Sequence, residues 1–158
     1  MGRLKESAQR VQEKLQELGY SNQILELEES TRTAQEAADA MGCEVAQIAK
    51  SIIFRLKHAN KPLLVVASGA NRVNEKQIAN QIGDKLEKAD ANFVRERTGF
   101  VIGGVAPLGH TEPILTLIDE DLFQYDELWA AAGHPKALFS LTPEELKKMT
   151  SGAVVSIK

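Results

Sequence analysis

A glycine-rich stretch in this chain offers main-chain rather than side-chain chemistry. Residues 99–110, GFVIGGVAPLGH, hold four glycines and one proline in twelve positions. Glycine lets the backbone approach a ligand closely, and successive free amides can hold an anion or a carbonyl oxygen. Pro107 stiffens the turn. The stretch indicates either an amide cradle for a ligand or a purely structural turn loop.

Lys50 opens an apolar run of strand length, KSIIFRL (50–56). In a strand, Lys50 shares one face with Ile52 and Phe54, while Ser51 lies on the other face. Such a lysine either extends its ammonium past the sheet edge into water or stands at the mouth of a pocket. In the second case it can hold a phosphate or a carbonyl oxygen. The residues alone leave both interpretations open.

Other side chains that could react are isolated. Thr33 is most simply a helix cap, whereas His110 and His134 each follow a glycine in a predicted loop and can line a pocket. A metal site would need a third ligand that the sequence does not offer. The single cysteine, Cys43, excludes a disulfide scaffold and a multi-cysteine zinc site. No GxSxG motif supports a hydrolase triad.

Residues 104–111 also come close to a phosphate-binding P-loop, GxxxxGK[ST]. His110 stands where the motif has its lysine, and Pro107 removes one amide from the phosphate cradle. Pro113 disfavours a helix that starts at residue 110. These departures argue against a nucleoside triphosphate site.

The elements that must position these residues follow one another irregularly. Apolar spacing, caps and helix-ending glycines predict helices at 4–18, 33–41, 74–82, 90–98 and from Thr142 onward. Short β-branched or alternating runs predict strands at 23–28, 50–56, 63–68, 100–102, 114–118, 127–132, 137–140 and 153–157. The runs 50–56 and 63–68, joined by a short turn-rich link, are predicted to form a hairpin. Neighbouring strands with tight links predict an α+β fold with a mixed, mostly antiparallel sheet and helices packed around it.

Composition sets the broad class. With 158 residues, 43% hydrophobic and 26% charged, we expect a single globular domain over 1–158. No apolar run reaches the roughly 20 residues of a membrane span, and the N-terminus lacks a signal peptide, so we expect a cytoplasmic protein that binds no membrane.

The charge balance bears on nucleic acid. The net charge is 19 − 22 = −3, which argues against an avid, non-specific nucleic-acid binder and against DNA as a partner. Basic side chains nevertheless group locally, and if the groups converge they can attract a polyanion. The groups are Arg3, Lys5, Arg10 and Lys14, then Lys57, Lys61, Arg72 and Lys76, then Arg95 and Arg97.

Five blocks of the sequence, in this order, resemble the YbaK and prolyl-tRNA synthetase-associated editing domain family. They are STRTAQEAA (30–38), QIAKSIIF (47–54), VASGANRVN (66–74), TGFVIGGVAPLGH (98–110) and DELWAAAGHPKALFSLTPEEL (126–146). The resemblance runs from about residue 28 to 147. The GGVAPLG loop and the lysine before the apolar strand are its specific parts.

The resemblance implies an α+β domain with a barrel-like sheet. It implies hydrolysis of a small amino acid such as Ala, Cys, Ser or Thr from mischarged tRNA, most commonly tRNA(Pro), without a cofactor. With no synthetase body in the chain, it implies a free-standing trans-editing protein whose partners are the tRNA 3′ acceptor end and an aminoacyl-tRNA synthetase. Lys50 corresponds to the family's strand lysine, and Gly103–Pro107 corresponds to its G-x-x-x-P loop.

We therefore hypothesise a site without a protein nucleophile or a metal. An aminoacyl ester is already activated, so positioning and oxyanion stabilisation can suffice. The catalytic candidates are Lys50 and the amides of Gly103, Gly104 and Val105. The candidates for substrate binding are Thr33, Ser51, Pro107, Gly109, His110 and His134.

Two other classes of function stay open at this point. The first is a non-catalytic module of the same fold that binds tRNA ends or a synthetase. The second is a small-molecule hydrolase or nucleotide-binding protein that uses the glycine loop. Pocket size cannot be inferred from the sequence, and one methylene changes binding by only about 1–3 kcal/mol, so the amino acid is left open.

Overall fold

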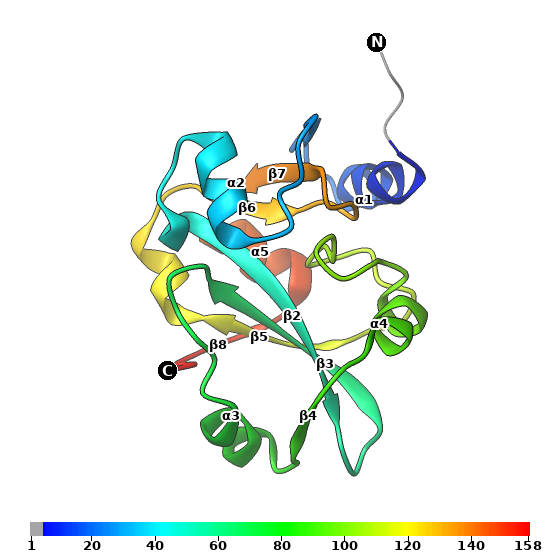
Figure 1. The fold of residues 1–158 in the computed structure, drawn as a ribbon, viewed down its shortest axis with the longest axis vertical. Coiled ribbons are helices and arrows are strands. Elements are labelled where there is room, and N and C mark those ends of the chain that lie inside the picture. Colours follow the sequence, from blue (N-terminus) through cyan, green and yellow to red (C-terminus); the bar gives the residue numbers. More distant parts are fainter. Residues whose placement is uncertain (1–4) are drawn as a thin grey trace.

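The computed structural model describes residues 5–158 as one twisted sheet with helices packed around it (Figure 1). The helices are α1 (Glu6–Glu17), α2 (Ala34–Met41), α3 (Glu75–Ile82), α4 (Ala91–Thr98) and α5 (Pro143–Thr150), with short 3₁₀ turns η1 (Val45–Gln47) and η2 (Glu120–Gln124). The strands are β1 (Ile24–Glu26), β2 (Ile48–Leu56), β3 (Lys61–Ser68), β4 (Leu86–Lys88), β5 (Leu115–Asp119), β6 (Leu128–Ala131), β7 (Ala137–Leu141) and β8 (Ala153–Val155).

The sheet is mixed and mostly antiparallel, which confirms the predicted fold class. Its strand order is β1-β7-β6-β2-β3-β5-β8, and β4 pairs separately with β2. The predicted β2–β3 hairpin forms its centre and crosses the molecule diagonally in Figure 1. Four pairings are antiparallel, and the pairs β2–β6, β3–β5 and β5–β8 are parallel.

One edge of β2 is left open in the middle of the sheet. Along this edge of β2, β6 pairs with Ile48 and Ala49, and β4 pairs with residues 54–56. Residues 50–53 therefore have no strand neighbour on that side within the described part of the chain. The amide of Gly69 donates to Ile48 O at 2.8 Å, and the β2–β3 register continues unbroken from there. Main-chain groups alternate sides along a strand. Ser51 and Ile53 therefore direct their N–H and C=O groups toward the open edge.

Capping residues fix the helix starts where the sequence predicts them. The side chains of Thr33, Asn74, Asp90 and Thr142 each accept a hydrogen bond from the amide three residues on. Such a bond satisfies one of the unpaired N–H groups of a helix start. The helix predicted from residue 4 begins at Glu6, and Leu4 lies outside the described residues.

The strand predicted at 100–102 is wrong. Phe100 is buried at 1% exposure, but its amide is bonded to Thr98 Oγ1 at 3.0 Å instead of to a neighbouring strand. The amide of Gly104 then closes a turn on Val101 O at 2.9 Å. The apolar run is therefore a buried loop, in which phenylalanine anchors the chain to the core. The sequence prediction also missed β4, a three-residue strand with two charged side chains.

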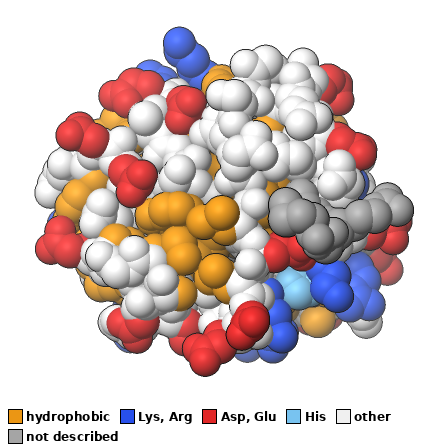
Figure 2. Space-filling model, turned by 90° about the horizontal axis from the view of Figure 1, so that it is seen from above, with side chains coloured by type: hydrophobic (Ala, Val, Ile, Leu, Met, Phe, Trp, Pro, Cys, Tyr) orange, Lys and Arg blue, Asp and Glu red, His pale blue; other side chains and the backbone are white. Residues whose placement is uncertain are grey.

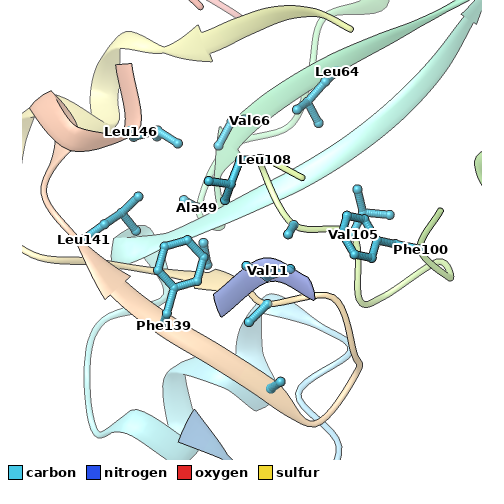
Figure 3. Packing of buried hydrophobic residues seen from close by; sticks show 14 of the residues in the cluster. Val11, Ala49, Leu64, Val66, Phe100, Val105, Leu108, Phe139, Leu141 and Leu146 are labelled. Atoms are coloured by element: carbon cyan, nitrogen blue, oxygen red, sulfur yellow. The ribbon is translucent and has the colours of Figure 1, made fainter. Parts of the chain in front are cut away.

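The glycine loop is part of the main core. Val105, Ala106 and Leu108 are all at most 4% exposed and belong to the cluster that α1 covers. Figure 3 shows Val11 of α1 between Phe139 of β7 and the loop. Because interiors are packed as densely as organic crystals, this loop is held rigidly rather than left free over the surface.

Charge is unevenly distributed over the surface. On the face seen from above, carboxylates surround an apolar patch, whereas Lys and Arg side chains lie beside a histidine at the lower right and at the upper edge (Figure 2). None of the helices within residues 5–158 has both the length and the apolar character needed to cross a membrane.

Candidate active site

The open edge of β2 borders a cavity of about 780 Å³. Its walls come from the start of α2, from β2, from the segment after β3, from the end of β4 and from the glycine loop. Among the lining residues are Arg32, Thr33, Lys50, Ser51, Ile52, Asn71, Arg72, Glu75, Lys88, Ile102, Gly103 and Val105. The structure thus brings five predicted site residues to one cavity: Thr33, Lys50, Ser51, Gly103 and Val105.

The glycine loop presents unpaired amides at this wall. The amide of Gly104 donates to Val101 O, but those of Gly103, Val105 and Ala106 find no acceptor among residues 5–158. Buried amides are nearly always hydrogen-bonded in folded proteins. Gly103 and Val105 line the cavity, so their amides are the candidates for binding an oxygen atom of a ligand there.

Two glycines are required by close approach of other segments. At Gly103, which has φ +89°, a Cβ atom would meet the Arg32 side chain. At Gly104, a Cβ atom would lie 2.8–2.9 Å from the main-chain atoms of His134. The loop is therefore clamped between the segment before α2 and the turn between β6 and β7.

Lys50 stands at the cavity and not merely at a sheet edge. It is exposed, and within residues 5–158 it forms no ion pair and no side-chain hydrogen bond. The cavity also contains Arg32, Arg72 and Lys88, while Glu75 is the one carboxylate among the lining residues recorded. The site is thus locally positive in a chain of net charge −3, which favours an anionic ligand.

The hydroxyl of Ser51 is buried without a partner. Among the described residues, its Oγ is the buried side-chain oxygen or nitrogen that lacks any hydrogen bond. Leaving such a group unsatisfied costs about 1–3 kcal/mol. Ser51 lines the cavity, so this unsatisfied hydroxyl lies in the wall of the candidate site.

Arg72 follows Asn71, whose side chain is hydrogen-bonded to the buried carboxylate of Asp119. Asn71 Nδ2 donates to Asp119 Oδ2 and to Asp121 Oδ2, both at 2.8 Å, and Asp119 is only 1% exposed. Lys158 Nζ lies 2.9 Å from Asp121 Oδ2, and with Asn71 it lowers the pKa of Asp121. The network fixes the chain after β3 next to the cavity.

The other predicted site residues lie outside the cavity lining. Pro107 is buried with the core part of the loop, and neither it nor Gly104 and Gly109 is among the lining residues recorded. His134 Nδ1 accepts from the amide of Lys136 at 3.0 Å and stays within its turn. These positions support the loop, and their predicted contacts with substrate stay a prediction.

His110 closes the far end of the glycine loop. Its Nε2 lies 2.7 Å from Ala106 O, and its ring meets the edge of Phe100 at 6.1 Å between centroids. The Arg10 guanidinium lies on Phe100, 4.4 Å from the ring centre. Burial, together with the charge of Arg10, lowers the pKa of His110 despite the opposing bond to Ala106 O.

We expect acid to destabilise the protein through His110. Its pKa is lower in the folded chain than in the unfolded one, so the unfolded chain takes up the proton first. The free energy of unfolding should therefore be highest above about pH 6.5 and fall as the pH drops below it. Urea titrations of the wild type and of His110→Gln between about pH 5 and 7.5 measure this dependence. The His110→Gln variant should show a shallower slope, because it lacks the imidazole that takes up a proton on unfolding. Equal slopes for wild type and His110→Gln would contradict this expectation.

The cations that converge on the cavity are mostly not those that the sequence groups together. Arg97 pairs with Glu112 at 3.3 Å, and Arg10 donates to Gly99 O at 3.0 Å. Of the three predicted basic groups only Arg72 lines the cavity, and Arg3 lies outside the described residues. Arg32 was missed because it is a single cation in a helix-start segment. The nearby cap Thr33 was the available signal.

Comparison with known proteins assigns the fold and the motifs to one family. Residues 28–149 match the sequence profile of the aminoacyl-tRNA editing domain. The chain is 32% identical over 133 residues to the uncharacterized protein YwhH of Bacillus subtilis, covering 84% of each chain. It is 25% identical over 126 residues to EbsC of Enterococcus faecalis, whose name proposes a Cys-tRNA(Pro)/Cys-tRNA(Cys) deacylase, covering 79% of this chain and 76% of EbsC.

A solved structure and a larger enzyme show the same likeness. A crystal structure described as a proposed trans-editing enzyme for prolyl tRNA synthetase superposes with a TM-score of 0.93, at 44% identity and 99% coverage of both chains. Proline–tRNA ligase of Limosilactobacillus fermentum matches over 94 residues at 33% identity, which is 57% of this chain and 16% of the ligase.

Proposed function

The chain belongs to the aminoacyl-tRNA editing domain family, and on that premise we propose that it is a trans-editing deacylase. It hydrolyses the ester between a small amino acid and the 3′-terminal adenosine of a mischarged tRNA. The observation that carries the proposal is that Lys50 and the unpaired amides of Gly103 and Val105 border one cavity. That pairing of an ammonium with main-chain donors suits a reaction that builds negative charge on a carbonyl oxygen.

The size and polarity of the cavity support this substrate. A volume of about 780 Å³ lies within the roughly 300–1,000 Å³ of small-molecule sites and suits one acylated nucleoside. The open edge of β2 adds the main-chain groups of Ser51 and Ile53. These groups supply the few fixed polar contacts that orient a ligand.

The proposed step needs no covalent intermediate with the protein. The amides of the loop bind the ester carbonyl oxygen, and Lys50 stabilises the negative charge that develops there. A water molecule, or a side-chain group of the substrate, attacks the carbonyl carbon. The ester C–O bond then breaks, and the ribose oxygen leaves with the proton that the attacking group has lost. Attack by water gives the free amino acid directly, whereas attack by a substrate side chain gives a cyclic ester or thioester that water then opens. Holding the reactants in place can supply about 7–11 kcal/mol of the barrier reduction.

The tRNA that we propose for this reaction is tRNA(Pro). Support comes from the names of the relatives, which point to Cys-tRNA(Pro) and to prolyl tRNA synthetase, and from the matching segment inside proline–tRNA ligase. The substrate is then tRNA(Pro) that carries a wrong, small amino acid, and the synthetase is a further partner.

Purified protein incubated with Ala-, Cys-, Ser- and Thr-tRNA(Pro) tests the proposal, with correctly charged Pro-tRNA(Pro) as the control. We expect fast release of at least one of the wrong amino acids and little release of proline. Residues that differ by one methylene are separated by only about 10–200-fold, so neighbouring amino acids should show graded rates.

The proposed deacylase activity would be contradicted if none of these tRNAs were hydrolysed by protein that is shown to be folded by a cooperative unfolding transition. Binding of the charged tRNA in the same preparation would then identify the non-catalytic module of this fold.

A further inference from the structure

We propose that Arg32 binds a backbone phosphate of the single-stranded 3′ end of the substrate RNA. The inference rests on the proposed function for the identity of the ligand. The evidence for the site itself is the placement of Arg32. Its backbone is fixed, its side chain lies on the glycine loop, and its guanidinium has no partner among residues 5–158.

Residues on both sides hold the backbone of Arg32. Thr31 is 6% exposed, and both its amide and its hydroxyl donate to Pro135 O, at 2.7 and 2.9 Å. Thr33 forms the capping box of α2 with Glu36, with both bonds at 3.1 Å. Arg32 is therefore presented from a rigid turn, and little backbone entropy is lost when it binds a ligand.

The stem of Arg32 packs along the glycine loop. A Cβ at Gly103 would meet Arg32 Cγ, with Cδ and Nε of the same side chain at 3.0 and 3.1 Å. The methylenes thus cover Gly103 while the charged end stays exposed, as is common for arginine. This contact places the guanidinium beside the loop whose amides the mechanism uses.

The guanidinium is free to bind an anion. Within residues 5–158, no side-chain hydrogen bond of Arg32 is found, and the three ion pairs involve other residues. Lys50, Arg72 and Lys88 line the same cavity, so the surroundings repel further cations. A planar fork of five N–H donors matches the geometry of a phosphate.

The chemistry of the substrate selects a phosphate as the anion. An aminoacyl ester has no free carboxylate, and its α-amine is neutral or positive. The negative charges near the reacting bond belong to the phosphodiester groups on the 5′ side of the terminal adenosine. With the ester at the loop amides, the next anion along the RNA is a phosphate, and Arg32 lies directly beside that loop.

Binding of an uncharged acceptor-stem RNA that ends in CCA tests the inference without any hydrolysis. The dissociation constant is measured by fluorescence anisotropy over a series of KCl concentrations for wild type, Arg32→Ala and Arg32→Lys. Lys61→Ala, at the exposed tip of the β2–β3 hairpin in Figure 1, is the matched loss of one charge away from the cavity. A second RNA without the unpaired 3′ nucleotides distinguishes the single strand from the stem.

Arg32→Ala should weaken binding of the CCA-ended RNA by about tenfold. It should also reduce the slope of log K against log[KCl] by about 0.7, the value for one contact to a single strand. Arg32→Lys should keep the slope with weaker binding, and Lys61→Ala should match wild type. The RNA without its 3′ end should bind wild type and Arg32→Ala equally.

An unchanged affinity and slope for Arg32→Ala would overturn the inference, and so would an equal loss on the RNA without its 3′ end. Because uncharged RNA is used, this result is independent of the mischarged-tRNA panel. If the protein hydrolyses mischarged tRNA but its Arg32→Ala variant binds RNA as tightly as wild type, only the proposed phosphate contact is contradicted. If the protein binds RNA through Arg32 but hydrolyses none of the mischarged tRNAs, only the proposed deacylase activity is contradicted.

Discussion

Replacement of Lys50 by alanine is expected to lower kcat/KM for deacylation by about 100- to 1,000-fold, the usual loss when one donor to a developing oxyanion is removed. The loss should fall mainly on kcat, because the ammonium interacts most strongly with charge that exists only in the transition state. Lys50 is exposed and unpaired among the described residues. Its removal should therefore change the free energy of unfolding by no more than about 0.5 kcal/mol.

Lys88→Ala is the matched control for this prediction. Lys88 also lines the cavity, and its replacement removes the same unit of charge. It pairs with Phe54, four residues along β2 from Lys50. It should raise KM by a few fold at most and leave kcat close to wild type. If Lys50→Ala and Lys88→Ala give the same modest loss, Lys50 contributes only to the general positive field and our assignment of the site is wrong.

Local signals in the sequence were sufficient for most of the fold. Thr33, Asn74, Asp90 and Thr142 each mark a helix start, because a side-chain oxygen at that position replaces a missing backbone acceptor. The β2–β3 hairpin could be predicted from local sequence alone, because two aliphatic segments of strand length joined by a short link pair with each other as antiparallel strands. The resemblance to the editing domains implied the same α+β architecture, a mixed and mostly antiparallel sheet with helices around it.

Non-local contacts explain where the prediction was wrong or incomplete. The run 100–102 has the composition of a strand, but the side chain of Phe100 is buried in the core and its amide donates to Thr98 Oγ1. That amide therefore cannot form a hydrogen bond with a neighbouring strand. β4 exists only because it pairs with the end of β2. Its sequence, LEK, carries no strand pattern of its own.

The candidate site likewise combines residues that local sequence signals identify with residues that only non-local contacts bring into place. Lys50 and the glycine loop stood out in the sequence because lysine in an apolar strand and clustered glycines are unusual. The open edge of β2, with Ser51 on it, follows from where β4 and β6 stop pairing, which no local pattern records. Arg32 reaches the site through its packing on Gly103, a contact that joins segments far apart in the chain.

Gly104→Ala is expected to damage both stability and catalysis. The added methyl would lie 2.8–2.9 Å from main-chain N, Cα and C of His134, where no flexible side chain can yield. Overpacking of this kind costs about 1–3 kcal/mol of unfolding free energy. Since Gly104 itself is not among the lining residues recorded, any loss of activity must come from displacement of the neighbouring amides of Gly103 and Val105.

A displacement of about 1 Å can cost 100-fold in rate, so kcat/KM for deacylation should fall by about that factor even where the variant is fully folded. Gly83→Ala is the matched control, because Gly83 ends α3 with φ +80° and no atom of the described residues lies within 4 Å of the added methyl. It should lose about 1–2 kcal/mol from the left-handed backbone alone and keep its kcat/KM. Both variants should lose a similar free energy of unfolding, but only Gly104→Ala should displace the amides of Gly103 and Val105. The comparison therefore distinguishes a loss of activity caused by general destabilisation from one caused by displacement of the loop. Normal activity in folded Gly104→Ala would mean that the loop amides do not hold the ester, and the cavity would then have to bind the carbonyl oxygen through Lys50 and the open edge of β2.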